Sequence, residues 1–72
     1  MNYIEKVYKN IGINIRKIRT KKRFSIKKLA IMSDISTGYL YKIENGKCFM
    51  SLDTLLNIAD ALEINVTELL QD

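Results

Sequence analysis

One local pattern occurs four times in this 72-residue chain: an apolar residue, then Ser or Asn, then an apolar residue four positions after that polar one. The polar side chain can accept a hydrogen bond from an N–H group in the first turn of a helix, while the apolar pair packs as a hydrophobic staple. The four copies are Phe24-Ser25…Leu29, Ile35-Ser36…Leu40, Met50-Ser51…Leu55 and Ile64-Asn65…Leu69. The pattern therefore predicts four helix starts.

A longer helix is expected ahead of these four. Asn2 can cap it, and Glu5 stands three residues later, where it can close a capping box. The apolar stripe of this helix is Ile4, Val7, Tyr8, Ile11, Ile15 and Ile18. The helix expected after Ser51 has an apolar side made of Leu52, Leu55, Leu56, Ala59 and Leu62. Tyr3, Tyr8 and Tyr39 are interpreted as packing residues.

The composition also favours helices. The chain has no proline and three glycines, which is typical of helices joined by short connections and not of a sheet with many turns. Its length suits one domain, residues 1–72. We predict an all-α fold, a compact bundle of five helices at about residues 3–21, 25–32, 36–44, 51–61 and 65–71.

The connection between the second and third expected helices is very short. Only Ser33-Asp34-Ile35 separates them, so the two helices must cross and cannot lie side by side. Ala30 supplies the small residue that a close crossing needs. Asp34 falls where the chain turns sharply, and aspartate tolerates the left-handed backbone conformation better than most residues.

The third expected helix has two unlike sides. Leu40 and Ile43 point one way, and the opposite side carries Thr37, Gly38, Tyr41 and Lys42. A solvated face usually carries Glu, Lys and Gln, whereas this one is small, aromatic and cationic. The pattern favours a face that recognises a ligand.

Charge is distributed unevenly along the chain. All twelve Lys and Arg lie in residues 1–47 with three acids, while residues 48–72 carry five acids and no base. Eight of the cations fall between Arg16 and Lys28. A basic half of this kind suits a polyanion, although a Lys-rich stretch is also typical of a solvated helix face. Charge alone leaves both interpretations open.

Several classes of protein are disfavoured. Cys48 is the single cysteine, the N-terminus does not resemble a signal peptide, and no run reaches the ~18 apolar residues of a membrane span. The chain has no histidine, no glycine-rich phosphate loop and no paired carboxylates at a defined spacing. We therefore expect a cytoplasmic protein that is not an enzyme and uses no metal, cofactor, small-molecule ligand or membrane.

Five segments carry a family resemblance: "IGINIRKIR", "SIKKLA", "DIS…YLYKIENGK", "SLDTLLNIADAL" and "INVTELL". In their order and spacing the sequence resembles the Cro/C1-type helix-turn-helix (XRE) family, which includes small phage repressors and controller proteins of restriction-modification systems. The resemblance covers about residues 11–70, with residues 1–10 as an extension of the first helix. It implies a lambda-repressor-like bundle in which helices 2 and 3 form the helix-turn-helix and helix 3 enters the DNA major groove.

The resemblance also implies roles for individual residues. The base-contacting residues would be Thr37, Gly38, Tyr41 and Lys42. The residues contacting the DNA backbone would be Ser25, Ile26, Lys27, Ser36, Asn45 and Lys47. Arg19 and Glu44 match positions that form an ion pair between the first helix and the end of the third. If buried, this pair would be important for stability.

Four positions depart from the family pattern. Ile26 stands where the family usually has Gln, so only its backbone N–H can contact a phosphate, and anchoring would shift to Lys27 and Lys28. Asp34 replaces the turn glycine, and Met50 replaces a frequent proline. Tyr41 replaces a small or polar residue, so the operator sequence cannot be carried over from the family.

Two functions follow from these observations. The first is a sequence-specific, double-stranded DNA-binding regulator that acts as a homodimer on a palindromic operator, with Val66 and Leu70 at the dimer interface. RNA polymerase would be a further partner, and activation and repression both remain open. The alternative is a helical protein-interaction module, such as a partner-binding antitoxin or accessory protein, with only generic DNA affinity. The apolar residues Ile26, Ile31 and Met32 on helix 2 favour that alternative.

Overall fold

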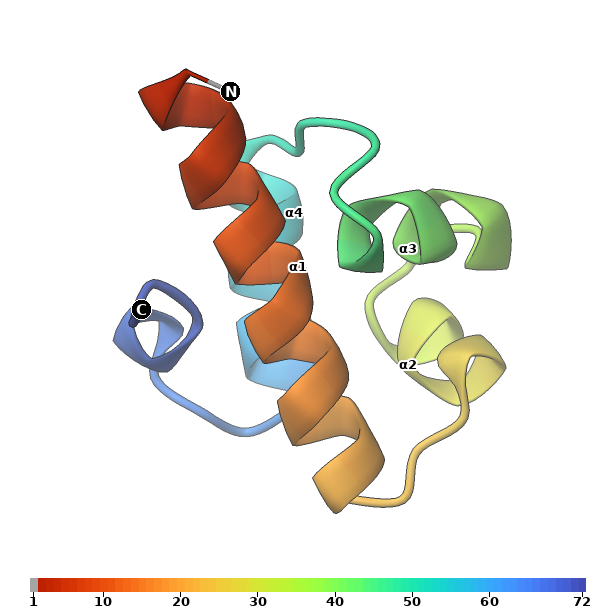
Figure 1. Ribbon diagram of the computed structural model, residues 1–72. Coiled ribbons are helices and arrows are strands. Elements are labelled where there is room, and N and C mark those ends of the chain that lie inside the picture. The colour runs from red at the N-terminus through yellow and green to blue at the C-terminus, as the bar shows by residue number, and fades with distance from the viewer. Residues whose placement is uncertain (1) are drawn as a thin grey trace.

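The computed structural model describes residues 2–72, whose regular structure is entirely helical. The elements are α1 (Tyr3–Lys21), α2 (Ile26–Met32), α3 (Thr37–Glu44), α4 (Leu52–Ala61) and a 3₁₀ helix, η1 (Val66–Leu69). In Figure 1, α1 crosses the front of the molecule with α4 behind it, α2 and α3 on one side and η1 on the other. The predicted all-α fold is confirmed.

The predicted fifth helix is wrong, because the structure has four α-helices and one short 3₁₀ helix in residues 2–72. The Asn65 side chain accepts hydrogen bonds from both the N–H and the hydroxyl of Thr67, which tightens the turn. Beyond it, the carbonyl of Leu69 accepts a hydrogen bond from the Asn14 side chain of α1 at 3.0 Å. The end of the chain is therefore tied to α1, and a 3₁₀ turn is the usual form of so short a helix.

Each predicted cap is present. The hydroxyls of Ser25, Ser36 and Ser51 accept hydrogen bonds from backbone N–H groups three residues ahead. Asn65 forms a capping box with Glu68. The Asn2 side chain accepts from the N–H of Glu5 at 2.9 Å, but within residues 2–72 the Glu5 side chain makes no return bond, so the capping box predicted there is only half formed. In each of the four repeats, the apolar residue four positions after the cap is buried: Leu29, Leu40, Leu55 and Leu69. The repeated pattern thus starts each helix and also directs it into the core.

Some residues expected to pack are exposed. Tyr3 is 80% exposed, Ile4 57% and Leu52 66%, and Leu56 is also exposed. The first turns of α1, the start of α4 and the loop just before it line an apolar groove of about 390 Å³, and Tyr3, Ile4 and Leu52 border it. The packing role expected for Tyr3 is therefore wrong.

Tyr8 and Tyr39 do pack, as expected. The ring of Tyr8 lies 4.6 Å from that of Phe49, and its hydroxyl donates to the carbonyl of Met50 at 3.3 Å. The hydroxyl of Tyr39 donates to the carbonyl of Phe49 at 3.4 Å. Both tyrosines hold the loop between α3 and α4 against the bundle.

No helix within residues 2–72 combines the length and the apolarity that crossing a membrane would require.

Candidate nucleic-acid interface

The helices α2 and α3 are joined by a tight, hydrogen-bonded turn. The N–H of Ser33 donates to the carbonyl of Leu29 at 2.9 Å, and the N–H of Ile35 donates to that of Ala30 at 3.0 Å. Asp34 has a φ of 58°, the left-handed conformation expected for it. Ala30 is buried, which lets the two helices approach closely. The local sequence therefore builds a helix-turn-helix.

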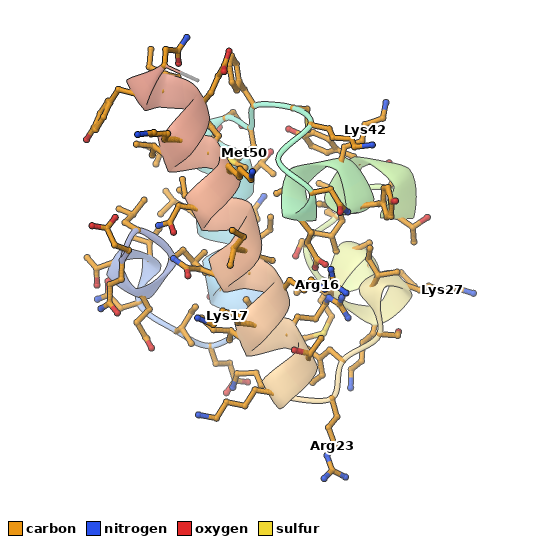
Figure 2. All side chains as sticks on the ribbon, viewed as in Figure 1. Arg16, Lys17, Arg23, Lys27, Lys42 and Met50 are labelled. Carbon is orange, nitrogen blue, oxygen red and sulfur yellow. The ribbon has the colours of Figure 1, made fainter. Side chains whose placement is uncertain are left out.

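The two sides of α3 differ as predicted in their burial. Leu40 and Ile43 are fully buried. The opposite side is exposed: Thr37, Gly38, Tyr41 and Lys42. In Figure 2 the Lys42 side chain extends away from the bundle. Burial of the one side holds α3 in place while the other stays free to contact a partner.

Gly38 is unusual because nothing in the protein requires a glycine there. Apart from the adjacent residues and the backbone of α3 itself, a Cβ atom added at this position would have no atom of residues 2–72 within 4 Å. Glycine within a helix is less stable than alanine by roughly 0.5–1 kcal/mol. Packing within the protein therefore does not explain why this position of α3 has a glycine.

An ion pair holds the end of α3 against α1. Arg19 Nε lies 2.7 Å from Glu44 Oε2 and Arg19 Nη2 lies 3.0 Å from Glu44 Oε1. Arg19 Nη1 also donates to the carbonyl of Phe24 at 2.8 Å, which ties the segment before α2 to the same pair. The hydrogen bond to Glu44 is the main cause of a raised pKa for Arg19; burial opposes the shift and the charge of Glu44 adds to it.

The expected backbone-contacting residues come from the start of α2, the cap of α3 and the segment that follows α3. Ser25 and Ser36 use their hydroxyl oxygens as caps, so their O–H groups remain as donors. Lys27 extends into solvent, as Figure 2 shows, and Lys47 is exposed. The amide of Asn45 donates to the carbonyl of Tyr41 at 2.8 Å. Their contacts to DNA stay a prediction.

A surface hollow of about 380 Å³ brings three elements together. It is lined by Arg16, Arg19, Ile26, Tyr41, Glu44 and Asn45, which come from α1, the start of α2 and the end of α3. Arg16 was not identified by the sequence reasoning. The sequence did contain a sign of its role: Arg16 stands three residues before Arg19, so the two lie on the same face of α1, the face toward Glu44.

The expected dimer residues lie on the other side of α1 from α3, where η1 packs (Figure 1). Val66 is half-buried and packs against the core, whereas Leu70 is 49% exposed. On α2, Ile31 and Met32 are also exposed, while Ile26 is half-buried. Residues 2–72 contain no cluster of three or more potential metal ligands.

Comparison with known proteins agrees with this geometry. The family model of the Cro/C1-type HTH DNA-binding domain matches residues 14–72. The HTH-type transcriptional regulator SlrR of Bacillus subtilis (strain 168) is 42% identical over 60 residues, which is 82% of this chain. The chain spans 40% of the length of SlrR.

Solved structures of regulators have the same fold. The restriction-modification controller protein C.AhdI from Aeromonas hydrophila is 34% identical with a TM-score of 0.84, over 86% of this chain and 94% of that chain. The clp gene regulator ClgR from Corynebacterium glutamicum is 30% identical with a TM-score of 0.86, over 89% of this chain and 68% of that chain. The chain belongs to the Cro/C1-type helix-turn-helix family of transcriptional regulators, which is a DNA-binding class and not an enzyme class.

Proposed function

We propose that this chain binds double-stranded DNA in a sequence-specific manner, with α3 in the major groove, and regulates transcription in the cytoplasm. The observation that carries this proposal is the division of α3 into a fully buried side and an exposed side with four potential contact residues. The major groove of B-DNA is wide enough to admit a helix, and each base pair presents a distinct set of donors and acceptors there.

The exposed residues of α3 have chemistry suited to base edges. Lys42 can donate to O6 and N7 of guanine, and the Thr37 hydroxyl can donate or accept. Tyr41 is 54% exposed and offers a ring as well as a hydroxyl. Gly38 would allow the backbone of α3 to approach the bases closely, which explains a glycine that the packing of the protein does not require.

The proposed phosphate contacts come from segments before and after α3 in the sequence. At the start of α2 they are Ser25, the N–H of Ile26, and Lys27; Ser36 caps α3, and Asn45 and Lys47 follow its end. Such contacts orient the protein on the duplex without specifying sequence. The base contacts of α3 would then decide which duplex is retained.

The proposed assembly is a homodimer on a palindromic operator, with Val66 and Leu70 in its interface. Two-fold symmetry would place the two copies of α3 in half-sites about 34 Å apart. The exposure of Leu70 supports this surface. Leu70→Asp should raise the dissociation constant of the dimer in sedimentation, whereas Leu52→Asp, at an exposed apolar position on α4, serves as the control. A wild-type chain that sediments as a monomer at tens of micromolar, with and without DNA, would contradict the proposal.

A gel shift tests the DNA-binding function. The probe is the DNA upstream of the chain's own gene, with a scrambled duplex of the same composition as competitor, at two salt concentrations. Retention of the upstream probe against the competitor supports a specific regulator. Equal, salt-sensitive retention of both duplexes would instead favour generic electrostatic binding.

A protein-interaction module is the second candidate, and one observation favours it. Ile31 is 68% exposed and Met32 46% exposed on α2, more apolar surface than a helix above the DNA backbone needs. Paired Ile31→Ser and Met32→Ser changes should leave specific DNA retention intact if the first function is correct. Contacts to RNA polymerase, or to another protein partner, would be lost in the same variant.

A further inference from the structure

We propose that Arg16 of α1 binds a phosphate of the DNA backbone in the hollow between α1, α2 and α3. This inference rests on the proposed DNA-binding function and adds a contact from α1, outside the helix-turn-helix itself. The hollow measures about 380 Å³ and borders the exposed face of α3 through Tyr41 and the end of α3 through Asn45. A duplex docked on α3 would therefore bring its backbone to this hollow.

The charges in the hollow leave Arg16 without a partner. Its three ionised side chains are Arg16, Arg19 and Glu44, and the last two satisfy each other through two hydrogen bonds. Within residues 2–72, the guanidinium of Arg16 makes no hydrogen bond or ion pair, and the residue is exposed. The hollow thus has an excess positive charge, and that charge belongs to Arg16.

The position of Arg16 matches this role. In Figure 2 its side chain lies on the side of α1 that faces α2, while the side chain of Lys17 extends toward η1 and does not line this hollow. Ile26 forms an apolar part of the hollow and offers no side-chain donor. The side-chain hydrogen-bond donors left for an anion are the guanidinium of Arg16, the hydroxyl of Tyr41, the remaining amide hydrogen of Asn45, and the two N–H groups of Arg19 that its bonds to Glu44 and Phe24 leave free.

The chemistry favours a phosphodiester. A guanidinium is planar and always charged, and it can donate two parallel hydrogen bonds to phosphate oxygens. The phosphates bordering the major groove are the anions that any duplex presents to a helix docked there. Because phosphate carries no sequence information, the contact should strengthen binding to all duplexes and add to its salt dependence.

The test compares Arg16→Gln with Lys17→Gln. Both substitutions remove one positive charge from adjacent positions of α1, but only Arg16 lines the hollow. Binding to a labelled duplex of mixed sequence is measured by fluorescence anisotropy at several KCl concentrations, and melting temperatures are measured for each variant. We expect Arg16→Gln to weaken binding about tenfold more than Lys17→Gln and to lower the salt slope by about 0.9 further.

Three results would decide against this contact or its basis. Equal losses in the two variants would overturn the inference and leave the DNA-binding function intact, since general electrostatics would then explain both. A fall in melting temperature confined to Arg16→Gln would also overturn it, because the residue would then act through folding. Absence of DNA binding by the unmodified chain would contradict the proposed function itself.

Discussion

Glu44 and Arg19 face each other across the junction of α3 and α1, with both carboxylate oxygens hydrogen-bonded to the guanidinium at 2.7 and 3.0 Å. The Glu44 side chain is only 3% exposed. The raised pKa of Arg19 means that its contribution to stability is present at neutral pH, which lies well below its unfolded pKa. That contribution is lost only as the pH rises through the folded pKa, so the pair still holds α3 in place through this arginine at neutral and mildly alkaline pH.

Glu44→Ala should leave the guanidinium of Arg19 without its charged hydrogen-bond partner, next to a buried cavity. We expect a loss of about 3 kcal/mol in the free energy of unfolding, at the low end for a broken buried pair because Arg19 keeps 13% of its side chain exposed. Urea denaturation measures the change. Asp60→Ala, at an exposed acid on α4, is the control and should change stability by under ~0.5 kcal/mol. A near-zero effect for Glu44→Ala would show that the pair contributes little.

Gly12→Ala should destabilise the fold. A Cβ at position 12 would collide with the backbone carbonyl of Ile43, so α1 and α3 would have to separate. Overpacking of this kind costs about 1–3 kcal/mol, and a clash with backbone is hard to relieve by a change of rotamer. Thermal unfolding monitored by circular dichroism measures the loss. An unchanged melting temperature would mean that the two helices approach less closely than the structure indicates.

Gly38→Ala should raise the stability of the protein but weaken its binding to DNA. Because a Cβ there has open space around it, the change should stabilise α3 by roughly 0.5–1 kcal/mol. The same methyl group would stand between the backbone of α3 and the bases, so binding to a specific duplex should weaken. Denaturation and anisotropy on one protein preparation measure both quantities. Stronger or equal binding would argue against close approach of α3 at this position.

Lys42→Ala and Lys47→Ala should weaken DNA binding in different ways. Loss of Lys42 should cost about 1–3 kcal/mol on the preferred duplex and relax base preference at one position. Loss of Lys47 should weaken all sequences alike and reduce the salt slope by about one. Competition binding with a set of single-base variants of the retained duplex distinguishes the two. Identical profiles would refute the separate roles of these lysines.

Ser33→Ala should be tolerated although the residue is buried. The hydroxyl of Ser33 has no hydrogen-bond partner within residues 2–72, and the residue is 1% exposed. Removing an unpaired buried hydroxyl should be neutral or stabilising. Ser36→Ala is the matched comparison, because loss of that cap should cost about 1 kcal/mol. A larger loss at Ser33 than at Ser36 in urea denaturation would disprove this account.

Local chemistry along the chain determined where the helices begin and how α2 meets α3. Capping depends on a side chain and the backbone a few residues ahead, so Ser25, Ser36 and Ser51 could be recognised without any tertiary information. The same holds for Asp34, whose backbone conformation is a property of a three-residue turn. Periodicity likewise separated the two sides of α3, since residues three and four apart share a face.

Packing between distant segments decided which apolar residues are buried and which residues line the surface hollows. Periodicity indicates that Ile4 and Leu52 lie on apolar faces, but only the arrangement of α1 and α4 leaves them uncovered. The end of η1 is held against the bundle by Asn14 of α1, which is far away in the sequence. Arg16 belongs to the candidate interface because α1, α2 and α3 converge around it. The burial of a residue and the shape of a surface hollow depend on which helices meet in space. The spacing of residues within a single helix does not contain that information.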